Sequence, residues 1–200
     1  MISVIIPYDR DRGFLSKCVQ SIESQTYRDF EIIHAKSDCS VAVNFNFGLK
    51  MSKGEFCKFV TEDDYLPENS LQDLVEGIGD APWAYANAIQ LEDPQKTTWI
   101  YKPNQFDFKS NCIQNQIHGG TTIYRTEILL SIGGMNETLW TAEEYDMHLR
   151  LWSKGYKPVY IDKEVYVHRL WNGQKSKQLR RTNKNKRDEE IKRIQALYSH

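Results

Sequence analysis

Three consecutive acidic residues form the part of this sequence best suited to chemistry. Glu62, Asp63 and Asp64 directly follow residues 56–60, an apolar run that predicts a buried strand with Lys58 as its single polar member. Carboxylates at the carboxyl end of a buried strand are costly unless a cation compensates them. Their oxygens suit Mg²⁺ or Mn²⁺, which in turn hold substrate phosphates. The alternative interpretation is a solvated acidic turn that precedes a helix.

Length and composition limit the class of protein. The chain has 200 residues, enough for one domain with a single core, and its net charge of -1 gives no reason to expect nucleic acid as a partner. No apolar stretch approaches the length of a membrane-spanning helix or a signal peptide. Four cysteines without metal-binding spacing are predicted to be reduced, buried thiols: Cys18, Cys39, Cys57 and Cys112. We therefore expect a soluble cytoplasmic protein.

The first eighty residues alternate predicted strands and helices. The strands are expected at residues 2–6, 30–35 and 56–60, and the helices at 14–25, 41–51 and 68–78. This alternation is typical of an open parallel sheet with right-handed crossovers. Ligands bind such sheets at the carboxyl ends of the strands, which is where the three acids lie.

The second half of the chain has a less regular pattern. Strands are expected at residues 83–91, 97–101, 121–124, 156–161 and 165–168, and helices at 127–132, 143–154 and near the C-terminus. Residues 102–117 are polar and aperiodic, which predicts a long loop.

Several short motifs follow one another in a specific order. They are Ser3–Pro7, residues 24–33, Asn46-x-Gly48-Leu49, Lys53–Phe56, Glu62-Asp63-Asp64, residues 132–137, residues 142–150 and Gly155-Tyr156-Lys157. Together they resemble the GT-A glycosyltransferases, most of all the inverting family 2 enzymes, over roughly residues 1–170. The resemblance implies an α/β GT-A fold, a Rossmann-like, mostly parallel mixed sheet flanked by helices. It also implies a nucleotide-binding half at about 1–80, an acceptor half at about 81–170 and a basic helical extension at 171–200.

The resemblance also implies an activity. It is metal-dependent inverting transfer of one sugar from a nucleoside diphosphate sugar, by default a UDP-sugar, to a hydroxyl of a glycan, protein or lipid-linked acceptor. Asp63 would hold Mn²⁺ or Mg²⁺ on the diphosphate, which neutralises charge on the leaving group. Glu144 would take the acceptor proton as the oxocarbenium-like transition state forms. The alternative for Glu143 and Glu144 is favourable charge at a helix N-terminus.

Further site residues follow from the same resemblance. Nucleotide-sugar contacts are implied for Pro7, Tyr8, Asp9, Ser37, Asn46, Glu62, Asp63 and Asp64, acceptor-side positions for His118, Gly119 and Glu143, and a further metal ligand for His168. Three of these have plain structural alternatives. Tyr8 could be a surface aromatic, Asn46 a helix-surface amide, and His118 a packed histidine.

The sequence departs from the family pattern in several places. Ser37 stands where an aspartate usually binds the base, Thr61 opens the metal motif in place of Asp, and Phe45 replaces a frequent basic residue. Glu144 replaces the usual Asp as base, a longer arm with the same chemistry. These departures keep open a catalytically silent sugar-nucleotide binding module within a larger assembly. A nucleotidyltransferase is less favoured, because the loop after the first strand has only Gly13.

The end of the chain is basic. It could dock on an anionic membrane or a partner domain, or form a solvated helical extension. Binding of nucleic acid is not expected, because aromatic residues are not interleaved with the charges. The basic residues are Lys175, Lys177, Arg180, Arg181, Lys184, Lys186 and Arg187.

Overall fold

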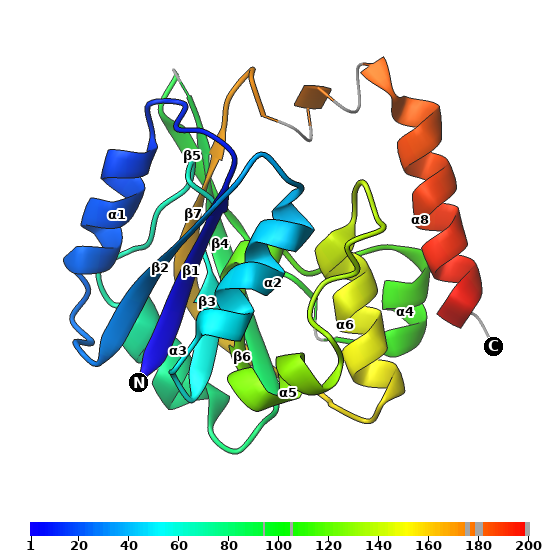
Figure 1. Cartoon of the computed structure of the whole chain (residues 1–200), viewed down its shortest axis with the longest axis horizontal. Helices are drawn as coiled ribbons and strands as arrows, with labels where there is room; N and C mark the ends of the chain where they lie inside the picture. The colour runs from blue at the N-terminus through cyan, green and yellow to red at the C-terminus, as the bar shows by residue number, and fades with distance from the viewer. Residues whose placement is uncertain (94, 105, 175–176, 179–181, 199–200) are drawn as a thin grey trace.

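The fold is built on one mixed sheet of seven strands (Figure 1). The computed structural model describes residues 1–93, 95–104, 106–174, 177–178 and 182–198, so Lys175, Arg180 and Arg181 of the basic run lie outside the described residues. The strands follow the order β2 (Phe30–Lys36), β1 (Ile2–Tyr8), β3 (Phe56–Phe59), β6 (Ile123–Arg125), β4 (Trp83–Glu92) and β5 (Thr97–Tyr101), and β7 (Val159–Leu170) also pairs with β4.

The strand directions confirm the predicted sheet. Strand β1 is parallel to β2 and β3, and β7 is parallel to β4. Strand β6 is antiparallel to both β3 and β4, and β5 is antiparallel to β4. Strands β1, β2, β3, β4 and β7 therefore run in one direction, and β5 and β6 run against them. The predicted division at residue 80 and the boundary at residue 170 stay predictions.

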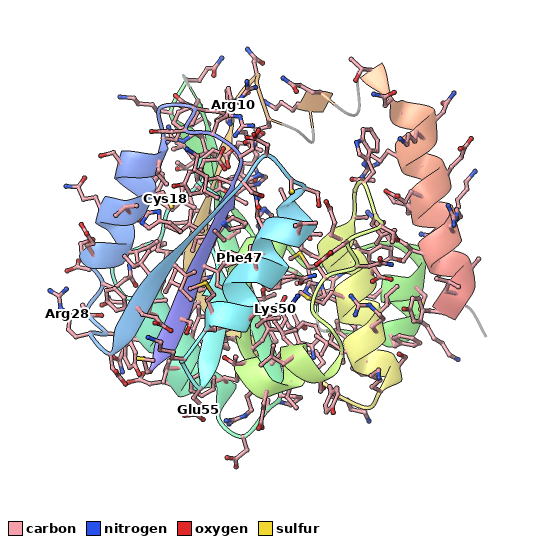
Figure 2. All side chains as sticks on the ribbon, in the orientation of Figure 1. Arg10, Cys18, Arg28, Phe47, Lys50 and Glu55 are labelled. Atoms are coloured by element: carbon pink, nitrogen blue, oxygen red, sulfur yellow. The ribbon has the colours of Figure 1, made fainter. Side chains whose placement is uncertain are left out.

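Helices cover both faces of this sheet because its side chains alternate. Ile2, Val4 and Ile6 of β1 face a core formed with helices α1 (Leu15–Glu23) and α3 (Ser70–Ile78). Ile5 points to the other face, where α2 (Val41–Met51), α5 (Thr126–Ser131) and α6 (Glu143–Ser153) pack. The outer side of α2 carries Phe47 and Lys50, both exposed (Figure 2).

A third, smaller cluster holds the C-terminal helix. Helix α8 (Lys184–Tyr198) buries Ile194 against Cys112 of α4 (Phe108–Ile113) and Tyr145 and Leu149 of α6. Figure 1 shows α8 beside α6 and α4, at the side of the molecule away from α1. The predicted C-terminal helix therefore exists and has a buried face.

Two local predictions were wrong. The expected loop at 102–117 contains α4, whose first turn is capped by the Asp107 side chain accepting from the Ser110 amide at 2.8 Å. The two strands expected at 156–161 and 165–168 are the single strand β7. Its ladder with β4 shifts register around Asn87, and this irregularity explains the polar interruption at residues 162–164.

The structure bears on the predicted burial of the cysteines and on the search for membrane-spanning helices. All four cysteines are free thiols, and three are buried, but Cys39 is exposed, so its predicted burial was wrong. In the described part of the chain, no helix is both long and apolar enough to cross a membrane.

A lysine side chain lies inside the core. Lys58 of β3 is fully buried, and its Nζ donates to the carbonyl oxygens of Gly120 at 2.5 Å and Thr122 at 3.3 Å. These carbonyls belong to the short helix η1 (Gly119–Thr121) and the residue after it. Burial lowers the pKa of the Lys58 amine to about 7. Lys58 therefore fastens the η1 turn to the sheet at a cost that depends on pH.

Replacing Lys58 with methionine should change how stability depends on pH. An unfolded lysine has a pKa of about 10.4, so between pH 7 and about 10 the unfolded state binds a proton that the folded state lacks. The free energy of unfolding of the native chain should therefore rise with pH across this window. Lys58→Met should lack this contribution, whereas Lys50→Met, a change at an exposed lysine, should keep it. Urea denaturation at several pH values measures this, and equal slopes in all three proteins would contradict the prediction.

Candidate functional site

A cavity of about 530 Å³ opens where β1 and β3 end. Its wall combines the ends of these strands with the N-terminus of α6 and the segment after β7, through residues such as Pro7, Asp63, Glu144 and Trp171. Figure 2 shows Arg10, which also lines the cavity, at the same end of the sheet as the loop after β1. The cavity lies at the position where open α/β sheets bind ligands.

Most of the predicted site residues meet in this cavity. Ten line it: Pro7, Tyr8, Asp9, Glu62, Asp63, Asp64, His118, Glu143, Glu144 and His168. Ser37, Asn46 and Gly119 do not line it. The functional roles of all these residues stay predictions.

Asp63 is held from the far end of the chain. Its Oδ2 accepts a hydrogen bond from the indole nitrogen of Trp171 at 2.9 Å, across 108 residues of sequence. The Trp171 ring packs edge-on against Phe14, with ring centroids 5.0 Å apart. Phe14 belongs to the first loop, residues 9–14, which joins β1 to α1. The carboxylate thus keeps a fixed direction at the cavity wall.

Asp64, in contrast, is buried and hydrogen-bonded inside the protein. Its Oδ1 accepts from the backbone N–H of Arg169, and its Oδ2 accepts from the hydroxyls of Tyr166 and Thr61, each at 2.7 Å. Burial, and next the charge of Asp63, raise the pKa of Asp64 to about 8. Asp64 therefore fastens the acidic turn, formed by Glu62, Asp63 and Asp64, to β7.

Glu62 forms an ion pair with Arg12, whose guanidinium also contacts the carboxylate of Asp9 at 2.7 Å. Burial, and next the charge of Asp63, raise the pKa of Glu62, while Arg12 acts in the opposite direction. This network joins the first loop to the acidic turn. No role for Arg12 was predicted from the sequence, although Arg12 lies in a charged segment that follows a predicted strand.

Glu144 lies in the first turn of α6, where the helix dipole favours negative charge. Its side chain packs so close to Gly119 that a Cβ atom there would lie 2.8 Å from Glu144 Cγ and 3.0 Å from its Oε1. Gly119 is therefore outside the cavity lining yet makes the room in which Glu144 sits. A larger residue at this position would push the carboxylate aside.

Two histidines stand together at the cavity wall. The rings of His118 and His168 have centroids 4.3 Å apart. The ring nitrogens of His168 both have partners, Gln90 Oε1 at 2.8 Å and Gln174 Nε2 at 3.1 Å. Burial lowers the pKa of His168 to about 4, so the ring is neutral near pH 7. His168 would have to give up one of these hydrogen bonds to bind a metal.

The acidic turn fits a metal ion only in a limited way. Within the residues that the structure describes, no group of three His, Cys, Asp or Glu side chains is placed to hold an ion. Glu62 is paired with Arg12, and Asp64 is hydrogen-bonded inside the protein. Asp63 faces the cavity with one carboxylate. This arrangement fits a Mg²⁺ or Mn²⁺ that takes most of its ligands from a diphosphate and water.

The two asparagines of α2 have different positions. Asn44 lines the cavity, and its side-chain nitrogen donates to the carbonyl oxygens of Tyr8 and Ser37, both at 3.1 Å. Asn46 points away, donates to the Met135 carbonyl oxygen and accepts from the Met135 N–H, both at 2.8 Å. Residues two apart lie on different sides of a helix. The structure therefore places Asn44, not Asn46, at the wall where the sequence analysis expected an asparagine.

No protein-family model matches the chain. Proteins named glycosyltransferases are related to it in sequence. The chain is 22% identical to an uncharacterized glycosyltransferase of Rickettsia typhi over 84% of the chain and 63% of that protein. It is 25% identical to one of Haemophilus influenzae over 76% and 62%. It is 23% identical to glycosyltransferase GlyG of Streptococcus pneumoniae over 86% and 72%.

Solved structures share the fold. Residues 1–349 of S. aureus TarS superpose with a TM-score of 0.64 at 18% identity, covering 84% of this chain and 60% of that one. The TarS structure in complex with UDP gives a TM-score of 0.68 at 17% identity and covers 98% of this chain and 64% of that one. The chain therefore has the GT-A fold and is related in sequence to proteins named glycosyltransferases.

The chain matches only part of the length of several relatives. The chain spans 63%, 33% and 63% of the length of three rickettsial relatives.

The GT-A fold of the chain places its acidic motif directly after β3 and its second acidic motif at the start of α6, in one cavity. The motif order predicted this pairing. It did not predict Arg12, Trp171 or Asn44, since each acts through a partner distant in sequence.

Asn46→Ala should destabilise the fold. The change leaves the backbone N–H and carbonyl oxygen of Met135 without their partner, which costs about 1–3 kcal/mol. Chemical denaturation should show this loss, whereas Gln72→Ala, an amide change on the surface of α3, should stay within about 0.5 kcal/mol of the native value. A loss below that limit for Asn46→Ala would mean that its side chain does not support the 134–137 turn.

Proposed function

We propose that this domain transfers one sugar from a nucleoside diphosphate sugar to an acceptor hydroxyl with inversion, using Asp63 on the donor side and Glu144 as general base. The observation that carries the proposal is that these two carboxylates line one cavity, although they come from separate elements. A cavity of about 530 Å³ is large enough for a ligand of drug-like size.

The donor is proposed to be a UDP-sugar. TarS has been solved with UDP-GlcNAc and with UDP, and its fold is shared by this chain. In this chain, Pro7 and Tyr8 at the end of β1 and Ser40 and Val41 at the start of α2 line the cavity together with Asn44 and would receive the nucleotide. Ser37 is bonded to Asn44 and acts by holding the loop, instead of lining the cavity.

Asp63 would hold Mn²⁺ or Mg²⁺ against the diphosphate. The ion, when bound, supplies positive charge that stabilises the departing diphosphate. Asp63 itself is fixed by Trp171, so its free face keeps one direction. Arg12 adds a permanent positive charge at the same wall and keeps Glu62 and Asp9 in place.

Glu144 would accept the proton of the attacking hydroxyl. The first turn of α6 stabilises its ionised form, which is the form a base needs. One base opposite the leaving group suffices for an inverting reaction, because no covalent sugar–enzyme bond forms. His118 and Glu143 lie on the same wall and would contact the acceptor.

The acceptor class and the location are broader proposals. The acceptor is a hydroxyl of a glycan, a protein or a lipid-linked molecule. We propose a cytoplasmic location because the four cysteines are free thiols.

A catalytically silent nucleotide-sugar binding module is the second candidate. The protein partners on both nitrogens of His168 favour it, because among the described residues they leave Asp63 as the one predicted metal ligand on the protein side. Ser37, where the family usually has an aspartate, favours it as well. Such a module would bind the donor and never turn it over.

Binding of UDP should be visible as thermal stabilisation that depends on Mn²⁺. A ligand at 100 times its dissociation constant adds about 2.7 kcal/mol to the free energy of unfolding. Asp63→Ala should abolish the Mn²⁺-dependent part, because the carboxylate that faces the cavity is lost. Asp80→Ala, at an exposed aspartate, should respond like the native chain. The panel should include ADP and GDP. No response to any nucleotide, with or without Mn²⁺, would overturn the proposed function.

Glu144→Gln should separate catalysis from binding. The amide cannot accept the proton, so kcat should fall by about 10² to 10⁴, while the affinity for UDP stays within about twofold. Glu76→Gln, on the surface of α3, serves as the matched control and should keep full turnover. Turnover can be followed as UDP released from a UDP-sugar. Retained turnover in Glu144→Gln would remove Glu144 as the base, and absence of turnover in the native chain that still binds UDP would favour the silent module.

A further inference from the structure

We propose that Glu190 of the C-terminal helix is a positioning residue, which holds the loop before α6 so that Glu144 points into the cavity. The proposal rests on the function proposed above, because it assigns the catalytic consequence to Glu144. In this proposal, α8 supports the site through the loop before α6 and is more than a C-terminal extension.

The contact between Glu190 and this loop is bidentate. Its Oε1 accepts from the backbone N–H of Trp140 at 3.1 Å, and its Oε2 accepts from the N–H of Thr141 at 2.7 Å. Hydrogen bonds of backbone N–H groups to a carboxylate are among the stronger ones in proteins, because the acceptor is charged. Both carboxylate oxygens of Glu190 are thus used on two adjacent peptide groups, 49 and 50 residues away in sequence.

The loop needs an external support. Ala142, the residue before α6, has a φ of 59°, in the left-handed region that costs an ordinary residue about 1–2 kcal/mol. Its side chain gives α6 no capping hydrogen bond. The conformation must therefore be stabilised from elsewhere, and Glu190 accepts from the N–H groups of the two residues that directly precede Ala142.

The same loop belongs to the cavity. Thr141, Ala142, Glu143 and Glu144 are four consecutive residues of its wall. Because they are contiguous, a change in the backbone at Thr141 or Ala142 moves the start of α6 and the carboxylate that follows. A displacement of about 1 Å at a reacting group can cost about 10²-fold in rate.

Helix α8 is itself firmly attached, so it can act as a fixed support. Ile194 is 2% exposed. Gln195 donates to the Ile113 carbonyl oxygen of α4 at 2.5 Å. The Lys186 ammonium lies 4.7 Å from the centre of the Trp140 ring, which adds a cation–π contact to the same loop. These contacts fix the direction from which Glu190 reaches the loop.

The test compares Glu190→Ala, Glu190→Gln and Glu189→Ala. The exposed Glu189 is adjacent on the same helix, so its removal changes the charge equally and controls for helix propensity. We expect Glu190→Ala to lower kcat about ten- to hundredfold while the affinity for UDP stays within about twofold, since Asp63 and the first loop are untouched. Glu190→Gln keeps one acceptor oxygen and should be intermediate, and Glu189→Ala should match the native chain.

Hydrogen exchange gives a second readout that needs no activity. In Glu190→Ala, the amides of residues 140–142 should exchange at least about tenfold faster, while those of residues 191–198 keep their protection. If the native chain has no transferase activity, this result still establishes the contact, so failure of the proposed function is recognised separately. Unchanged exchange at residues 140–142 would overturn the proposal. An unchanged kcat in an active chain, or loss of protection throughout α8, would also overturn it, because Glu190 would then not position the base.

Discussion

Three adjacent carboxyl groups would repel one another if all were ionised, and the protein avoids this repulsion by giving each a different environment. Glu62 is neutralised by Arg12 from the first loop. Asp64 turns inward and accepts hydrogen bonds from Arg169, Tyr166 and Thr61. Asp63 is left at the cavity wall, where the described residues give its carboxylate one hydrogen-bond partner, the Trp171 indole. The remainder of the site depends on this division, because it fixes which carboxylate is available to a ligand.

The Asp64 network also sets the shape of the cavity. Strands β3 and β7 are not neighbours in the sheet, yet Asp64 joins the turn after β3 to Arg169 near the end of β7. Trp171 follows directly and is thereby brought over Asp63 and against Phe14. The cavity wall at Asp63 is thus closed by residues from the beginning and the end of the domain, which explains how a polar turn keeps a defined form.

The wall that carries Glu144 depends on close packing against Gly119 and on hydrogen bonds from residues that do not line the cavity. Gly119 gives Glu144 the space for its side chain, and Lys58 fastens the turn that contains Gly119 through buried hydrogen bonds to Gly120 and Thr122. The proposed support from α8 acts on the same wall through the loop before α6. The wall that carries Asp63 and the wall that carries Glu144 are therefore held by separate networks.

The alternation of strands and helices, the mixed and mostly parallel sheet, the place of the three acids after a buried strand and the resemblance to GT-A glycosyltransferases could all be predicted from the sequence. The three acids are Glu62, Asp63 and Asp64. These predictions follow from local periodicity and from the order of short motifs, such as the alternation of Val4, Ile5 and Ile6 between the two faces. Three-dimensional packing was needed to show that Asn44 and not Asn46 borders the cavity, that Asp64 is buried while Asp63 faces the cavity, and that Trp171 contacts Asp63 and Glu190 contacts the loop before α6. Each of these depends on a partner about 36 to 108 residues away, and a hydrogen bond over that separation leaves no periodic trace in the sequence.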